Sequence, residues 1–215
     1  MYVVFLAGGI ASGKSTAAQE LESLGAWRVD LDQVSREVLE SGTETTLAVA
    51  EAFGQDLLDP ETGELNRSLL ARRAFADPES IALLEAIELP AIAARLAEVL
   101  THGACAEKEP VCCVVEVPLL DRVETMLDLA DEVLLVSLPI AERRVRAIGR
   151  GMSPEDFDAR AANQPSDAWL REHADTVIEN DGTLDDLIDS VRAWWRGHEE
   201  DGWRPRTQAG ETHGS

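Results

Sequence analysis

The segment that decides the fold is "VVFLAGGIASGKSTAAQELESLG", Val3 to Gly25. An apolar run stops in a cluster of glycines, and a lysine and two hydroxyl residues come before a helical pattern. In that pattern Ala17, Leu21 and Leu24 fall at positions i, i+4 and i+7, and Gly25 supplies a left-handed end. The segment therefore predicts a buried strand, a glycine-rich loop and a helix in direct succession.

The loop carries a phosphate-binding motif. Residues 8–15, GGIASGKS, match G-x-x-x-x-G-K-[ST] without a mismatch. Glycines let the backbone wrap so that N–H groups point at phosphate oxygens, and the following helix aims its positive dipole end at the same place. Lys14 can reach the β- and γ-phosphates, and the Ser15 hydroxyl is placed to bind Mg²⁺. A chance glycine turn is the alternative, but the flanking strand and helix favour a phosphate-binding loop.

Apolar runs and helical patterns alternate along the chain. Five runs predict buried parallel strands: Tyr2–Ala7, Ala26–Asp30, Val111–Val117, Glu132–Ser137 and Thr176–Glu179. Strands that alternate with helices indicate an α/β fold with a parallel sheet flanked by helices.

Two stretches are too long or too polar for simple crossovers. Residues 33–105 are helical in pattern and are expected to form an insertion that covers one side of the sheet edge, and residues 147–173 are rich in Arg and Asp. We expect a single domain over 1–197 with a core of about 1–32, 106–146 and 174–197. The tail over 198–215 lacks periodicity and is predicted to be disordered.

The chain is strongly acidic, with a net charge of −22 over 215 residues. Such a surface repels nucleic acids and anionic membranes, so neither is an expected partner. Lys14 and Lys108 are the only lysines, and a solubility adaptation to salt explains this composition better than an acidic binding surface. The sequence leaves the oligomeric state open.

Other compositional features favour a cytoplasmic protein. No basic leader precedes the first strand, and no apolar run reaches the length of about 18 residues that a membrane span needs. The odd set of Cys105, Cys112 and Cys113 fits neither a disulfide framework nor a zinc site, and buried thiols in a reducing compartment are expected. The four histidines, at 102, 173, 198 and 213, show no metal-ligand spacing.

Arginines form a stripe after the fourth strand. Arg143, Arg146 and Arg150 lie at i, i+3 and i+7, on one face of a helix. Beside the polar stretch at 147–173 they suit a lid that clamps phosphates. A solvated helix face paired with nearby carboxylates is the competing interpretation, and the spacing does not decide between them.

Carboxylates follow two of the predicted strands. Asp30 and Asp32 point the same way if the second strand continues that far. At this position Asp32 could take the proton of an acceptor hydroxyl or bind Mg²⁺ through water, or it could instead be the N-cap of the next helix. Glu116 ends the third strand, either as a second acidic magnesium partner or as a carboxylate that faces solvent.

The chain from about residue 2 to 195 resembles the dephospho-coenzyme A kinase family. The stretches that carry the resemblance are "LAGGIASGKST", "VDLDQVSREVLESG", "GELNRSLLARRAFADPES", "VVEVPLL" and "ADTVIENDGTLDDL". The resemblance implies ATP-dependent phosphorylation of the ribose 3′-hydroxyl of dephospho-CoA, which gives CoA and ADP in the last step of coenzyme A biosynthesis. It also implies a P-loop kinase fold with a five-stranded parallel sheet, a helical CoA-binding insertion and a lid.

The resemblance implies roles for individual residues. Asp32 matches the catalytic base, with Lys14 and Arg146 as further catalytic residues. The acceptor-binding residues are Asp32, Arg36 and Arg67, and Mg²⁺ is held by Ser15, with Asp32 as a partner through water. The motif itself assigns ATP binding to Gly8, Gly9, Ile10, Ala11, Ser12, Gly13, Lys14, Ser15 and Thr16. The resemblance adds Arg150 as a lid arginine near ATP, and Asn180 and Gly182 in the loop near the adenine.

The chain departs from the family pattern at three places. Leu89 stands where the family usually has a histidine before Pro90, the turn at 150–153 is shortened, and Asp121-Arg122 follow "PLL". Two other functions share the phosphate-binding loop: a kinase of a nucleotide, nucleoside or sugar, and a nucleotide-binding switch. The stretches around 30–37 and 65–75 favour dephospho-CoA, and the chain has no N-K-x-D guanine motif.

Overall fold

The computed structural model describes residues 1–102 and 110–204 of the chain. These residues form two compact units. One comprises Met1–Val29 and the described part of Ala104–Ser215, and the other comprises the described part of Asp30–Gly103. That the second is an insertion into a single domain stays a prediction. Cys105, Lys108 and His213 lie outside the described residues.

The first unit is built on a five-stranded sheet. Its strands are β1 (Tyr2–Ala7), β2 (Trp27–Asp30), β3 (Cys112–Glu116), β4 (Glu132–Ser137) and β5 (Thr176–Glu179), in the order β2-β3-β1-β4-β5. The pairs of β1 with β3, of β1 with β4 and of β4 with β5 are parallel. The predicted α/β fold with a five-stranded parallel sheet is therefore confirmed.

Burial explains why these strands could be predicted from the sequence. Every residue of β1, β3 and β4 is buried, so these strands are continuous apolar runs instead of alternating patterns. The predicted bounds of β1, β4 and β5 match the structure, while β2 begins one residue later and β3 is one residue shorter at each end.

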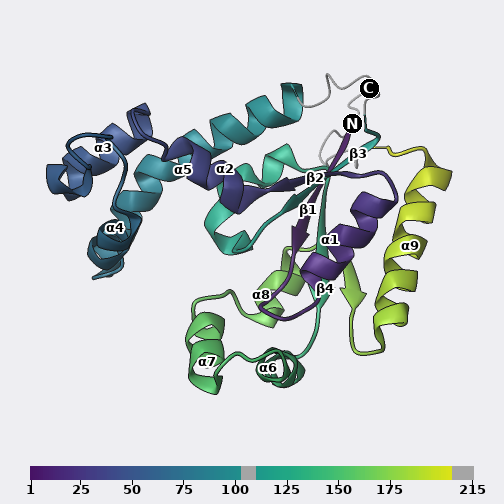
Figure 1. Ribbon diagram of the computed structural model, residues 1–215. Coiled ribbons are helices and arrows are strands. Elements are labelled where there is room, and N and C mark those ends of the chain that lie inside the picture. The colour runs from purple at the N-terminus through teal and green to yellow at the C-terminus, as the bar shows by residue number, and fades with distance from the viewer. Residues whose placement is uncertain (103–109, 205–215) are drawn as a thin grey trace, which may run out of the picture. The chain divides into compact units, whose positions relative to one another are not determined.

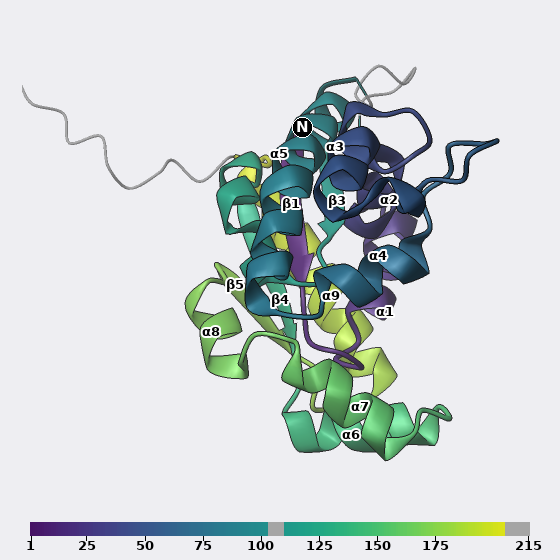
Figure 2. The same ribbon diagram turned by 90° about the vertical axis from the view of Figure 1, so that its left-hand side faces the viewer.

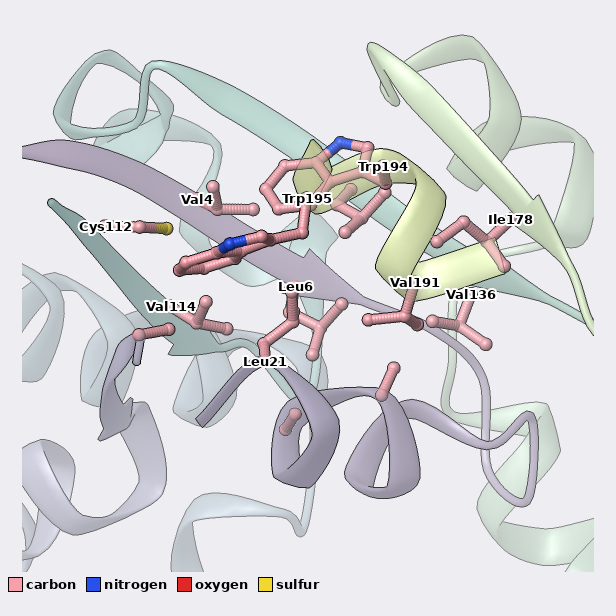
Figure 3. Close-up of a cluster of buried hydrophobic side chains, with 14 of the residues drawn as sticks. Val4, Leu6, Leu21, Cys112, Val114, Val136, Ile178, Val191, Trp194 and Trp195 are labelled. Carbon is pink, nitrogen blue, oxygen red and sulfur yellow. The ribbon is translucent and has the colours of Figure 1, made fainter. Parts of the chain in front are cut away.

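Helices cover the sheet of this unit. They are α1 (Lys14–Ser23), α6 (Ile140–Gly149), α7 (Pro154–Ala162), α8 (Asp167–Glu172) and α9 (Leu184–Asp201), with a 3-10 segment η3 (Leu120–Leu129). Helices α1 and α9 pack side by side (Figure 1). Leu21 of α1 and Trp195 of α9 gather with Leu6 of β1 in one buried cluster (Figure 3).

The C-terminal helix extends beyond the expected boundary. We expected a disordered tail from residue 198, but α9 continues to Asp201 and ends at Gly202 in a left-handed cap. His198 packs against the Tyr2 and Trp194 rings, and Trp203 contacts the same rings, so these aromatic contacts hold the last turn on the sheet. The boundary at 198 was therefore wrong, and residues 205–215 lie outside the described part of the chain.

The second unit is helical. Its elements are α2 (Leu31–Val38), α3 (Glu44–Phe53), η1 (Gln55–Leu57), α4 (Arg67–Ala74) and α5 (Pro78–His102). Helix α5 contacts α2, α3 and α4 and serves as their common support (Figure 2). Pro90 lies inside α5, and Leu89 precedes it on the same helix.

Candidate functional site

A cavity of about 450 Å³ opens beside the glycine-rich loop. It lies within the first unit, at the end of β1 and the start of α1. Its lining combines that loop with residues after β3 and from the α6–α8 region: Gly8, Gly9, Ile10, Ala11, Ser12, Gly13, Lys14, Ser15, Thr16, Pro118, Leu119, Arg150, Arg160, Asn163 and Gln164.

The loop backbone has the geometry of an anion cradle. Gly13 caps α1 with φ 104°, and no side chain hydrogen-bonds to the first turn of the helix. Because those N–H groups are not covered by a capping side chain, they are placed to bind a phosphate. Ala11 adopts a left-handed φ of 60°, a conformation that costs a non-glycine residue about 1 kcal/mol or more.

Buried side chains support this loop from below. The Asn180 amide donates to the Ser12 carbonyl at 2.6 Å, and a Cβ on Gly13 would collide with that amide. The Ser12 hydroxyl is buried and has no hydrogen-bond partner among the described atoms. An unpartnered buried hydroxyl in this loop fits a site completed by a ligand with acceptor oxygens.

Lys14 and Ser15 also line the cavity, as the motif predicts. The Lys14 ammonium donates to the Val117 carbonyl at 2.9 Å, which aims its side chain across the loop toward the end of β3. Ser15 is exposed on the first turn of α1. Within the described ranges no cluster of three or more His, Cys, Asp or Glu could hold a metal. The donors present fit a Mg²⁺ held by one hydroxyl, nucleotide phosphates and water.

The three arginines of the predicted stripe have different environments. Arg143 is only 4% exposed; it donates to the Leu138 carbonyl and pairs with Asp167. Its guanidinium lies behind the loop, where a Cβ on Gly9 would collide with it. Arg143 is therefore neither a phosphate clamp nor part of a solvated face, because it is a buried support of the loop.

Arg146 and Arg150 complete the stripe. Arg146 donates to the Asn180 carbonyl at 2.8 Å and to the Gly182 carbonyl at 3.4 Å, so it fixes the loop after β5 and is not among the cavity residues. Arg150 follows α6 and lines the cavity.

Three polar cavity residues are among those that sequence reasoning missed. Arg160 lies on α7, and Asn163 and Gln164 follow that helix. The Gln164 side-chain carbonyl accepts a hydrogen bond from the Ile10 N–H at 2.8 Å. The polar composition of 147–173 marks the segment, but nothing in the spacing singles out these positions.

The residues expected on the acceptor side belong to the second unit. Strand β2 ends at Asp30, whose side chain caps α2 by accepting the Asp32 N–H at 2.9 Å. Both geometric expectations for Asp32 are thereby corrected, since it lies neither on a continued strand nor at the N-cap. Asp32 is exposed in the first turn of α2, one turn before Arg36, whose carbonyl accepts from the Arg67 guanidinium at 3.1 Å.

Two glutamates have unusual surroundings. Glu116 is 8% exposed and pairs with Arg28 from β2, so it is not the solvent-facing carboxylate we considered. Glu88 precedes Leu89 on α5; burial raises its pKa to about 7, although the charge of Arg67 opposes the shift.

Comparison with known proteins places the chain in a family. A profile described as "Dephospho-CoA kinase" matches residues 2–186. The chain belongs to the dephospho-CoA kinase family. Members of this family, which are transferases, phosphorylate dephospho-CoA with ATP in the last step of CoA biosynthesis. The dephospho-CoA kinase of Corynebacterium jeikeium is 40% identical over 198 residues, which are 92% of this chain and 100% of that protein.

Solved structures show the same fold. A structure from Thermus thermophilus is 31% identical with a TM-score of 0.72, and the match covers 91% of this chain and 97% of that one. A dephospho-CoA kinase from Campylobacter jejuni is 22% identical with a TM-score of 0.68, over 93% of this chain and 98% of that one. At that identity the second match supports the P-loop kinase fold alone.

Proposed function

We propose that this chain transfers the γ-phosphoryl group of ATP to the ribose 3′-hydroxyl of dephospho-CoA, with CoA and ADP as products. The observation that carries the proposal is a phosphate-binding loop with an uncapped helix N-terminus and Lys14, in a chain that matches the dephospho-CoA kinase family over residues 2–186. Backbone amides bind the triphosphate without side-chain charge, which matters in a protein of net charge −22.

The donor side uses the cavity residues. Residues 8–16 bind the phosphates, the Ser15 hydroxyl contributes to a Mg²⁺ site, and Lys14 and Arg150 stabilise charge on the transferring group. When bound, Mg²⁺ neutralises charge on the phosphate oxygens. Arg146 holds the backbone of Asn180 and Gly182, and Asn180 in turn holds the loop through Ser12.

The acceptor side uses α2 and α4. Asp32 accepts the proton of the attacking hydroxyl, or binds the metal through water, since it is an exposed carboxylate on the first turn of α2. Arg36 and Arg67 bind the acceptor. The Arg67 guanidinium donates to the Arg36 backbone carbonyl, which ties α4 to α2 at this place, and guanidinium groups suit an anionic substrate.

One assay tests the proposal directly. Purified protein is incubated with Mg-ATP and, separately, with dephospho-CoA, AMP, CMP or pantothenate, while ADP formation is followed. We expect ADP and CoA with dephospho-CoA and only background hydrolysis with the other compounds. ADP release with AMP but not with dephospho-CoA contradicts the proposal and favours a nucleotide kinase.

Cellular location and partners beyond the substrates stay predictions. In the part of the chain that the structure describes, no helix is both long and apolar enough to cross a bilayer. A cytoplasmic location and the absence of nucleic-acid and membrane partners rest on composition alone.

A further inference from the structure

The segment between α7 and α8 contacts the phosphate-binding loop at two places. Gln164 follows α7, and its side-chain carbonyl accepts the Ile10 N–H at 2.8 Å. Three residues later Asp167, at the start of α8, pairs with Arg143, the buried guanidinium against which Gly9 lies. Residues 164–167 are therefore fixed at both ends to the loop and its support.

Arg160 lies close to this anchored segment. It is in the last turn of α7, four positions before Gln164, which follows the helix. Two hydrogen bonds fix the turn between them. The Asn163 side-chain amide donates to the Ala159 carbonyl at 2.9 Å, and the Gln164 backbone N–H donates to the Ala161 carbonyl. Both Arg160 and Gln164 line the cavity of the phosphate-binding loop.

The cavity arginines are not neutralised. Among the described residues, neither Arg150 nor Arg160 has a carboxylate within 4.0 Å, whereas Arg144 and Arg171 on neighbouring helices are paired with Asp158 and Glu179. In a chain with 41 acidic and 19 basic residues, two unpaired guanidinium groups in one cavity provide a local positive potential. Such a potential serves a phosphoryl group only if the guanidinium groups are held in place.

We propose that Gln164 is a positioning residue for phosphoryl transfer: by binding the Ile10 N–H it holds the end of α7 against the phosphate-binding loop and keeps Arg160 in the cavity. This inference rests on the proposed kinase function for its catalytic consequence. Its structural part, the tie between Gln164 and the Ile10 amide, can be measured without any acceptor. Arg160 is the group that meets the phosphate, and Gln164 acts through it.

Steady-state kinetics with dephospho-CoA and Mg-ATP provide the first test. Loss of a single hydrogen bond predicts that Gln164→Ala lowers kcat about tenfold, while KM for dephospho-CoA stays within about twofold. Loss of a charged group at the transferring phosphate predicts that Arg160→Ala lowers kcat about a hundredfold. Gln19→Ala is the matched control, because Gln19 is exposed on α1 and its side chain makes no hydrogen bond or ion pair with the described residues; it should behave as wild type.

The double variant separates positioning from an independent effect. If Gln164 acts through Arg160, adding Gln164→Ala to Arg160→Ala changes kcat by less than about twofold. If the two losses multiply, or if Gln164→Ala matches Gln19→Ala, the proposal is overturned. Gln164→Glu keeps an acceptor oxygen for Ile10 but adds negative charge to the cavity, so it should raise KM for ATP.

Amide hydrogen exchange supplies a readout that does not depend on turnover. Gln164→Ala should speed exchange of the Ile10 amide and of residues 154–164, whereas Gln164→Glu and Gln19→Ala should keep wild-type protection. Should wild type fail to phosphorylate dephospho-CoA, the proposed function fails and this exchange comparison alone decides the role of Gln164. Equal exchange in Gln164→Ala and wild type contradicts the tie itself.

Discussion

At the scale of single residues, the donor and acceptor groups differ in how they are held. Lys14 is oriented by its hydrogen bond to the Val117 carbonyl, so its position comes from the fold around β3. Asp32 is exposed, and within the described part of the chain its place is set by the first turn of α2, which Asp30 caps. Removing each side chain should therefore affect different quantities.

Lys14→Ala should lower kcat by at least about a hundredfold, because it removes charge stabilisation of the transferring phosphate. It should also weaken ATP binding, which a fluorescent nucleotide analogue can measure. Gln19→Ala, on the same helix, serves as the control. Normal turnover of Lys14→Ala would contradict the assignment of the glycine-rich loop as the phosphate-binding site.

Asp32→Asn should lower kcat by about two to four orders of magnitude and leave ATP binding nearly unchanged, because an amide cannot accept the proton. Asp30→Asn is the matched control, since Asn caps a helix as well as Asp does and α2 should remain intact. If both variants turn over like wild type, Asp32 is not the base.

At the scale of elements, the C-terminal helix α9 is attached to the sheet by a buried carboxylate. The Glu132 side chain, at the start of β4, is fully buried and accepts from the Tyr2 hydroxyl, the Trp194 indole and the His198 ring. Burial alone raises its pKa, but the hydrogen bonds from Thr176, Trp194 and Tyr2 and the charge of His198 outweigh burial, so the pKa of Glu132 lies below its usual 4.5.

This lowered pKa predicts an acid-sensitive attachment. The Glu132 carboxylate contributes stability above the unfolded value of 4.5, and this contribution is lost as the pH falls through the lower folded pKa. Glu132→Gln should therefore lose more stability at pH 7 than at pH 3, as measured by urea unfolding with tryptophan fluorescence. The exposed Glu199→Gln on α9 is the control, and an equal loss at both pH values contradicts the prediction.

Glu88 on α5 predicts a pH dependence of stability opposite in sign to that of Glu132. Its folded pKa of about 7 lies above the usual 4.5, so the folded state binds its proton more tightly and stability falls as the pH rises from about 4.5 to about 7. Glu88→Gln should therefore raise the urea midpoint at pH 8 relative to wild type, with little gain at pH 5. Glu51→Gln, exposed on α3, should show no such difference between the two pH values. If Glu88→Gln raises the urea midpoint equally at pH 5 and pH 8, titration of Glu88 is not the cause of the gain.

Features that depend on local sequence could be predicted, whereas contacts between residues far apart in the chain could not. The bounds of β1 and β4 were predicted to the residue because every residue in them is buried, which gives a continuous local apolar run. The bounds of β5 were also predicted, although only Ile178 of its four residues is buried. The tie between Gln164 and Ile10 was not predicted, because it joins residues 154 positions apart and depends on how α7 packs. Arg143 was misjudged for the same reason: helical spacing gives a shared face but not which member faces Gly9.

The whole molecule is dominated by its charge of −22. Repulsion among carboxylates disfavours any compact state and is screened by salt, with a Debye length of about 3 Å at 1 M. We expect the thermal midpoint to rise by several degrees between 0.05 and 1 M KCl at pH 7.5. A charge-reduced variant in which exposed acidic residues become Gln or Asn should show a smaller rise, and a falling midpoint in wild type contradicts the explanation.

The buried thiols of β3 allow opening of the sheet to be measured chemically. Cys112 and Cys113 are each fully buried on β3, an interior strand of the sheet, and burial raises the pKa of both thiols, that of Cys113 to about 12. A thiolate is the reactive form, so neither sulfur can be alkylated or oxidised until the strand is exposed. In a Cys105→Ser background, the rate of modification by a thiol reagent therefore measures how often the sheet opens, and bound nucleotide should slow that rate.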